Sequence, residues 1–297
     1  MKTNRKSDLH SKWGSEDEIG ALNEISPELI VAASKLVKQG RIFELSHVLE
    51  NGIPSDWFHG NFQYSTFRRH EDSKKVFPSK NNLEAMNVRL EMADHTGTHL
   101  DSLNHVSIGG KMYNNNDSFR LTDTFGTSRL GVEKLVPIFT RGVLIDATSL
   151  SDSGELKSGY LITPDEIRKF LKRHRIEIRK GDAVLFFTGW EQYWMVDNKK
   201  FLGSCPGIGM ESAHFLVERG VSVIGADTPG VEVDPSEETG QAGPVHQFLI
   251  TKNGIILVEN LKLDELRKEQ IFEFLFACLP LKIKGGSGSP VSPIAII

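Results

Sequence analysis

The residue types best suited to chemistry lie together in the segment HTGTHLDSLNH, residues 95–105. It contains His95, His99 and His105, with Asp101 between the last two. Two imidazoles and one carboxylate form a ligand set that suits Zn²⁺, Mn²⁺ or Fe²⁺ and leaves coordination positions open for water and substrate. The segment therefore predicts a divalent metal site held by His95, His99 and Asp101.

The residues before this cluster predict the strand that positions it. In MNVRLEM, residues 86–92, apolar side chains alternate with other residues, which is the period of a half-buried strand. If the strand continues, His95, His99 and Asp101 share one face. An ideal strand would hold the two histidines about 13 Å apart, too far for one ion with bonds near ~2.1 Å. We therefore expect the backbone to bend at Gly97.

A closed structural zinc site is the alternative use of these residues. Such a site takes four protein ligands, often cysteines, and His105 could supply the fourth. The two cysteines, Cys205 and Cys278, are distant in sequence from the cluster and from each other. They also give no basis for a disulfide framework.

The composition bounds the class of protein and its surroundings. The formal net charge is −4 and the pI is near 6.2, so the chain has no basic footprint for nucleic acid or anionic membranes. The first residues lack the apolar core of a secretory signal, and no run of about 18 apolar residues occurs. We expect a cytoplasmic protein whose partner is a small-molecule substrate.

The remaining pattern alternates strands and helices, as α/β proteins do. Strands are predicted in IFELSHVL, RGVLIDAT, GDAVLFFTGW, VSVIGADT and NGIILVEN. Helices are predicted from Pro27, capped by Ser26, from Pro164, with Thr163 and Glu166 as a capping box, and in GMESAHFLVERG. Residues 51–85 are predicted to form long loops, and the tail GGSGSPVSPIAII an ordered final segment.

Four residues far downstream are further candidates for the site. His246 follows Gly243-Pro244 in a predicted loop, and Glu259 ends the apolar strand IILVE, an unfavourable place for an acid unless it faces a charge. Asp227 and Glu232 have the same standing. Spacing alone does not join any of them to the cluster, and each could equally be a surface residue.

HTGTHLDSLNH closely resembles the His-x-Gly-Thr-His-x-Asp-x-Pro-x-His motif of the metal-dependent cyclase-like amidohydrolases, a family that includes bacterial kynurenine formamidase and isatin hydrolase. The resemblance covers nearly the whole chain. It implies an α/β fold of the swivelling β/β/α type, with a barrel-like mixed sheet core and flanking helices. It also implies a homodimer or higher homo-oligomer. We expect an N-terminal arm and helix at 1–40 and a single hydrolase domain at 41–297.

The resemblance also implies roles for individual residues. His95, His99 and Asp101 match the ligands of the first metal, and His105 matches the catalytic acid–base. His246 and Glu259 match a distal pair that holds a second metal or lies near the first. The expected cofactor is therefore one or two Mn²⁺ or Zn²⁺ ions per subunit. The motif's proline is replaced by Leu103 here, so the motif supports the family but does not single out the formamidase.

The expected reaction is hydrolysis of an amide or cyclic amide C–N bond by metal-activated water, with an aryl formamide or an isatin-like lactam as substrate. Trp57, Phe58 and Phe67 are candidates to stack on an aryl group, or are core or interface aromatics. Two alternatives stay open. One is a lactonase, dehydratase or cyclase that uses the same site on an oxygenated substrate, and the other is a non-catalytic metal-binding homologue.

Overall fold

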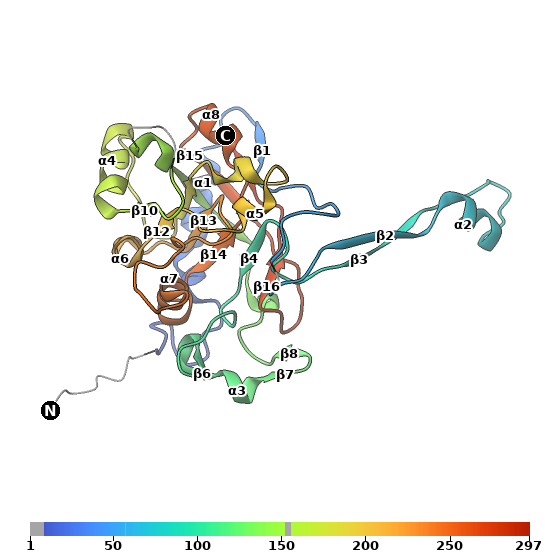
Figure 1. The fold of residues 1–297 in the computed structure, drawn as a ribbon, viewed down its shortest axis with the longest axis horizontal. Helices are drawn as coiled ribbons and strands as arrows, with labels where there is room; N and C mark the ends of the chain where they lie inside the picture. The colour runs from blue at the N-terminus through green and yellow to red at the C-terminus, as the bar shows by residue number, and fades with distance from the viewer. Residues whose placement is uncertain (1–8, 57, 152–155) are drawn as a thin grey trace.

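A nine-stranded mixed sheet forms the centre of the computed structural model, which describes residues 9–56, 58–151 and 156–297 (Figure 1). The sheet curls into a half-barrel, which confirms the predicted barrel-like α/β core. Its strands, in spatial order, are β1 (Ile42–Glu44), β17 (Ile294–Ile296), β15 (Glu273–Cys278), β9 (Ile138–Asp146), β11 (Ala183–Phe187), β13 (Val223–Ala226), β14 (Ile256–Glu259), β4 (His99–Asp101) and β16 (Gly288–Pro290).

The four strands β9, β11, β13 and β14 are parallel neighbours and are almost entirely buried. Parallel strands need cover on both faces, which explains why they read as continuous apolar runs in the sequence. All four were expected from the sequence. The strand β15 was not predicted from the sequence. It pairs with β9, and its side chains from Phe274 onward are buried.

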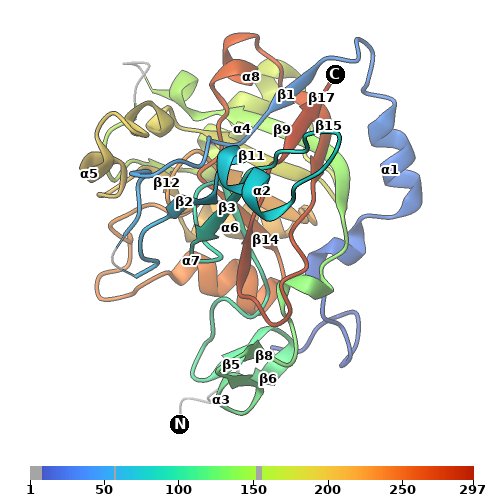
Figure 2. The same ribbon diagram turned by 90° about the vertical axis from the view of Figure 1, so that its right-hand side faces the viewer.

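The helices are short and lie around the sheet (Figures 1 and 2). The predicted caps are present: Ser26 caps α1, and Thr163 and Glu166 form the capping box of α4. The α-helices are α1 (Pro27–Ser34), α2 (His70–Val76), α3 (Ser118–Leu121), α4 (Pro164–His174), α5 (Asn198–Phe201), α6 (Met210–Val217), α7 (Pro244–His246) and α8 (Asp264–Lys268). No helix of the described residues is long and apolar enough to cross a bilayer.

Residues 63–91 form an arm that projects from the body (Figure 1). The arm is an antiparallel pair, β2 (Gln63–Arg68) and β3 (Asn87–Glu91), with α2 at its tip. The prediction of long loops over 51–85 was therefore wrong in part, because β2 and α2 lie in this range. The prediction of a half-buried strand in MNVRLEM was also wrong in part, because β3 forms there but is exposed along most of its length. Leu90, for example, is 52% exposed. The alternation in MNVRLEM reflects a solvated hairpin rather than a core strand.

The strand also does not run unbroken from β3 to the ligands. The chain turns at residues 94–98, with Gly97 in the left-handed region at φ 65°, and resumes as β4. The left-handed conformation favours glycine, and a Cβ at this position would also lie 2.4 Å from Cδ2 of Leu49 and push that side chain aside. The predicted bend at Gly97 is confirmed.

Both ends of the described chain pack on the body. The tail is ordered as predicted, since β16 pairs with β4 and β17 lies between β1 and β15. Ala21 and Leu22, from the N-terminal segment, lie in the main hydrophobic core. The boundary between an N-terminal segment at 1–40 and a hydrolase domain at 41–297 stays a prediction. Small two-stranded pieces complete the fold: β5 (Lys111–Met112) with β6 (Asn116–Asp117), β7 (Thr122–Asp123) with β8 (Gly126–Thr127), and β10 (Leu161–Ile162) with β12 (Gly207–Ile208).

Candidate metal centre

The centre begins with the pairing of β4 and β14. His99 and Asp101 lie two residues apart on β4 and therefore share a face. The antiparallel register places Glu259, the last residue of β14, directly opposite His99. His99 Nε2 lies 3.3 Å from Glu259 Oε2 and 3.5 Å from Asp101 Oδ1. The register thus joins the distant glutamate to the cluster.

His95 enters from the turn before β4. Its Nδ1 lies 2.9 Å from Asp101 Oδ1, and its ring meets that of His99 edge-on with 5.0 Å between centroids. His95, His99 and Asp101 each offer a ligand atom within 4.8 Å of the others, and all three are buried. This is the ligand set predicted from the sequence.

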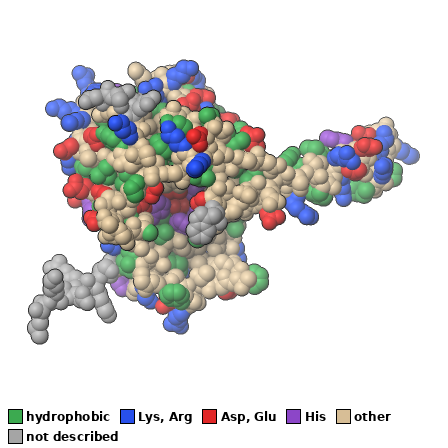
Figure 3. All heavy atoms as spheres, in the orientation of Figure 1, with side chains coloured by type: hydrophobic (Ala, Val, Ile, Leu, Met, Phe, Trp, Pro, Cys, Tyr) green, Lys and Arg blue, Asp and Glu red, His purple; other side chains and the backbone are tan. Residues whose placement is uncertain are grey.

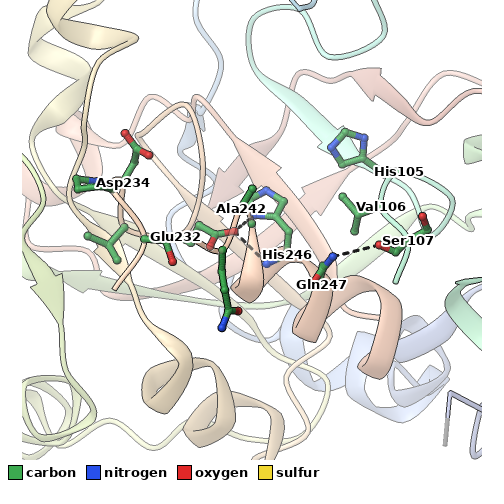
Figure 4. Close-up of a pocket in the computed structure, with 13 residues that line it drawn as sticks. His105, Val106, Ser107, Glu232, Asp234, Ala242, His246 and Gln247 are labelled. Carbon is green, nitrogen blue, oxygen red and sulfur yellow. Dashed lines mark hydrogen bonds and ion pairs between the residues drawn. The ribbon is translucent and has the colours of Figure 1, made fainter. Parts of the chain in front are cut away.

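His246 reaches the centre from α7, far from β4 in the sequence. Its Nε2 lies 3.0 Å from Glu259 Oε1 and 3.8 Å from Asp101 Oδ2. Asp101, His246 and Glu259 form a second group with ligand atoms close enough for one ion. Glu232, left undecided by the sequence, bonds the other side of this imidazole at Nδ1 and accepts the backbone N–H of His246 (Figure 4).

The hydrogen bonds on the outer sides of the three imidazoles orient them toward a cation. His99 Nδ1 donates to the carbonyl of Gly97 at 2.9 Å, and His246 Nδ1 donates to Glu232. His95 Nε2 bonds the hydroxyl of Ser287 at 2.9 Å. With the outer nitrogens of His99 and His246 carrying the protons, their inner nitrogens present lone pairs to carboxylate oxygens. An imidazole nitrogen and a carboxylate oxygen that face each other with lone pairs repel, and a cation between them removes this repulsion.

Asp101 provides a second sign that the residues fit a metal. It is fully buried, and neither of its carboxylate oxygens accepts a hydrogen bond from another described residue. Burial raises the pKa of Asp101, but the neighbouring imidazoles of His105, His95 and His99 outweigh it and hold the pKa well below its usual range. A buried carboxylate without hydrogen bonds is costly unless it is paired or ligates a metal.

The buried carboxylates also change the pKa values of the imidazoles. Burial disfavours the charged form of His99, but Asp101 and Glu259 outweigh it and raise its pKa to about 10. The pKa of His246 is also raised: burial opposes charge there too, and Glu232 and Glu259 overcome it. Without a metal, these sites would therefore hold protons, which a cation of higher charge can replace.

His105 differs from the ligands. It follows β4 in a turn in which its N–H bonds the carbonyl of Ser102, and its Nε2 lies 3.9 Å from Asp101 Oδ2. Burial first, and then the neighbouring imidazoles of His95 and His246, lower its pKa to about 4 against the opposing effect of Asp101. His105 is thus a neutral imidazole at pH 7, able to accept a proton.

His105 and His246 line one cavity of about 720 Å³ (Figure 4). Histidine and acidic side chains are visible at a hollow on this face of the molecule (Figure 3). The π-helix Gln247–Lys252 links the two sides: Gln247 Nε2 donates to the carbonyl of Ser107 at 3.2 Å, and Thr251 Oγ1 to that of Val106 at 3.1 Å. These bonds tie the segment after His105 to the element that carries His246.

Of the predicted aromatic residues, Phe58 and Phe67 are described by the structure, and neither lines this cavity. Phe58 is 72% exposed, and Phe67 lies on the arm, 58% exposed, under the guanidinium of Arg89. Trp57 lies outside the described residues. The sequence reading did not single out His59, which stacks on His95 with 5.3 Å between ring centroids. Its only sequence signal is its place beside the aromatic pair Trp57-Phe58.

Leu103, the departure from the family motif, does not touch the chemistry. Its side chain is fully buried in the main hydrophobic core. The substitution is therefore a packing change beneath the turn that leads to His105. Asp227 is likewise outside the centre, because it accepts hydrogen bonds from Thr188 and Gly189.

Comparison with known families decides the affiliation of the chain. The family model described as "Putative cyclase" matches residues 43–233, which include the whole HTGTHLDSLNH segment. The chain belongs to the cyclase family. The resemblance noted in the sequence is confirmed.

Relatives of this cyclase-family chain include two hydrolases. It is 27% identical to an isatin hydrolase from Roseibium aggregatum over 70% of this chain and 73% of the relative. It is also 27% identical to a kynurenine formamidase from Bacillus thuringiensis over 75% and 86% of the two chains. A crystal structure of a novel cyclase shares the fold with a TM-score of 0.88 and 28% identity, covering 98% of this chain and 100% of that one.

Proposed function

We propose that this protein is a metal-dependent hydrolase of C–N amide bonds, acting on an aryl formamide or an isatin-like cyclic amide. The observation that carries the proposal is the arrangement of His95, His99 and His246, whose inner nitrogens face the buried carboxylates of Asp101 and Glu259 beside the neutral His105. The relatives named isatin hydrolase and kynurenine formamidase support the choice of an amide as substrate.

His95, His99 and Asp101 would hold the first ion, and His246 and Glu259, sharing Asp101, a second. Nitrogen and oxygen ligands of this kind suit Zn²⁺ or Mn²⁺. A divalent cation, when bound, acidifies a water molecule and polarises the scissile carbonyl. The chain supplies the geometry and the proton transfers.

His105 is assigned the proton transfers. As a neutral imidazole it accepts a proton from the attacking water while the water oxygen bonds to the carbonyl carbon. It then returns this proton to the nitrogen as the C–N bond breaks, so the products are a carboxylic acid and an amine. General acid–base catalysis of this kind contributes roughly 10²- to 10⁴-fold.

Polar side chains at the cavity wall would orient the substrate. Gln241, Gln247 and Ser107 line it with His105 and offer amide and hydroxyl groups. Among the described residues, no lysine or arginine lines it. Phe58, in the loop that brings His59 onto His95, stays our candidate for contact with an aryl ring. Phe67 and Trp57 stay predictions of the same kind.

The assembly and location of the enzyme are also proposals. We infer a homodimer, supported by the apolar side chains that the arm exposes, such as Phe77, which is 51% exposed, and Leu83, which is 55% exposed. We infer a cytoplasmic location from the sequence. Light scattering of the purified protein tests the first inference, and a monomeric mass at micromolar concentration would contradict it.

A substrate screen tests the proposed reaction. Metal-reconstituted protein is offered isatin, N-formylkynurenine, a simple formanilide and simple lactones, with product identified by mass. We expect hydrolysis of at least one amide, and loss of that activity in His105→Ala but not in the exposed control His70→Ala. Turnover of lactones alone, with no amide hydrolysed, would assign the site to oxygenated substrates instead.

A further inference from the structure

A chain of hydrogen bonds leads from His95 to a carboxylate that is not in the metal centre. His95 Nε2 lies 2.9 Å from Oγ of Ser287, and this hydroxyl lies 2.9 Å from Oδ2 of Asp94. Asp94 is the residue immediately before His95, whereas Ser287 belongs to the tail just before β16. The two ends of the fold therefore meet at this one imidazole.

The donors in this chain can be assigned from the bonding of Asp94. Its Oδ2 accepts the backbone N–H of Ser287 at 2.8 Å and that of Gly288 at 3.0 Å as well as the Ser287 hydroxyl. The hydroxyl has one proton and donates it to the carboxylate, so only a lone pair is left for His95. His95 must then carry its proton on Nε2. Its Nδ1, 2.9 Å from Asp101 Oδ1, is left with a free lone pair.

His95 is thus oriented in the opposite sense to its neighbours. His99 and His246 carry the outer proton on Nδ1 and turn Nε2 inward, whereas His95 turns Nδ1 inward. A ligand that must present Nδ1 needs a specific acceptor for Nε2–H, because the other tautomer would aim a proton at the metal position.

The local structure is built to hold this acceptor in place. A Cβ on Gly288 would lie 2.7 Å from Cε1 of His95, so the ring fits only because residue 288 is glycine. The carbonyl of Ser287 accepts the N–H of Ser102 at 2.9 Å, next to the ligand Asp101. The Gly-Ser composition of the tail therefore serves close packing against the ligand.

We propose that Asp94 and Ser287 are positioning residues that select the Nε2–H tautomer of His95 and so present its Nδ1 to the metal. The inference rests on the proposed metal site but does not depend on the substrate. Losing such an outer hydrogen bond typically weakens metal affinity by roughly 10- to 100-fold.

Metal affinity of matched variants tests the proposal. Zn²⁺ or Mn²⁺ binding is measured by competition with a chromophoric chelator in Ser287→Ala, Asp94→Asn and the double variant. We expect roughly 10- to 100-fold weaker binding in each. Because both residues act through one hydrogen-bond chain, the double variant should lose no more than Ser287→Ala alone. Ser287→Thr, which keeps the hydroxyl, should recover most of the affinity.

Two controls separate positioning from general effects. Ser289→Ala removes a buried hydroxyl two residues after Ser287, on β16. This hydroxyl bonds Leu281 N–H and the carbonyl of Pro290 rather than His95. Glu91→Gln removes an exposed negative charge three residues before Asp94. Both should bind metal as the wild type does. Unchanged affinity in Ser287→Ala and Asp94→Asn, or equal losses in the controls, would overturn the proposal.

A direct readout of the tautomer keeps the inference separate from the proposed function. Long-range ¹⁵N–¹H spectra of histidine-labelled, metal-free protein distinguish a proton on Nδ1 from one on Nε2. We expect an Nε2–H on His95 that is protected from exchange, and loss of this protection in Ser287→Ala. A neutral His95 ring with its proton on Nδ1 and none on Nε2 in the wild type would refute the relay, even if the enzyme proved to be an amide hydrolase. Failure to hydrolyse any amide would leave these expected signals unchanged.

Discussion

Glu259 lies directly opposite His99 in the antiparallel pairing of β14 and β4, and the two side chains come within 3.3 Å of each other. Facing residues in such a pair project from the same side of the sheet. Glu259 also contacts His246, so it connects both groups of candidate ligands. The strand register therefore places one carboxylate between the two groups of candidate ligands.

Glu259→Gln should change the number of bound ions. Asp101 belongs to both ligand groups, whereas Glu259 belongs only to the second. We expect elemental analysis to find less metal per subunit in Glu259→Gln than in the wild type, with the first ion retained, and none in Asp101→Asn. Equal metal in Glu259→Gln and the wild type would show that His246 and Glu259 do not hold an ion.

His105→Ala should retain its metal and lose turnover. The imidazole lines the cavity and stands outside both ligand groups, so its removal takes away proton transfer without opening the metal site. We expect kcat to fall by roughly 10²- to 10⁴-fold, measured at saturating substrate and metal. If metal is lost together with activity, His105 is a fourth ligand of a closed site, which is the alternative weighed from the sequence.

Metal binding should release protons and weaken in acid. The pKa of His99 in the metal-free protein is raised to about 10, because Asp101 and Glu259 outweigh the effect of burial. At pH 7 a metal ion must therefore displace a proton from His99. As long as the pH stays below that pKa, each increase of one pH unit should raise the metal affinity about tenfold. Titration calorimetry in buffers of different ionisation enthalpy counts the protons. Binding without proton release would contradict this charge balance.

Away from the metal, Glu191 should make stability depend on pH. Burial, and then the carboxylate of Asp227, raise its pKa from 4.5 to about 9. The folded chain thus holds a proton that the unfolded chain releases, so this contribution to stability is complete below pH 4.5 and is lost as pH rises toward 9.

Glu191→Gln removes that dependence. We expect the variant to be more stable than the wild type at pH 8, by about 5 kcal/mol, and to differ from it by only about 1 kcal/mol at pH 5. Urea unfolding at the two pH values measures the difference, and exposed Glu177→Gln serves as the control. A variant that is less stable than the wild type at pH 8 would show that Glu191 is ionised in the folded protein.

Much of this architecture could be predicted from local pattern. The parallel strands are continuous apolar runs because both faces are covered, and the ligands His99 and Asp101 share a face because strand side chains alternate. Gly97 marked the bend because few other residues adopt its conformation. The apolar end of the tail marked an ordered segment, now seen as β16 and β17.

What local pattern could not supply is long-range pairing. Nothing near Glu259 indicates that its strand pairs with β4, and nothing near Ser287 indicates that it reaches His95. In the arm, local pattern gave a wrong prediction of burial. The sequence of β3 alternates as a half-buried strand does, although Leu90 faces solvent. Burial depends on what else packs nearby, which alternation does not encode.

The most direct test of the account is to follow turnover against bound metal. Protein stripped by a chelator is reloaded with Zn²⁺ or Mn²⁺ in steps, and amide hydrolysis and metal content are measured on the same samples. The account predicts no turnover without metal and a rise in proportion to the ion bound by His95, His99 and Asp101, with none in Asp101→Asn. Full activity of the stripped protein, or of Asp101→Asn, would contradict it.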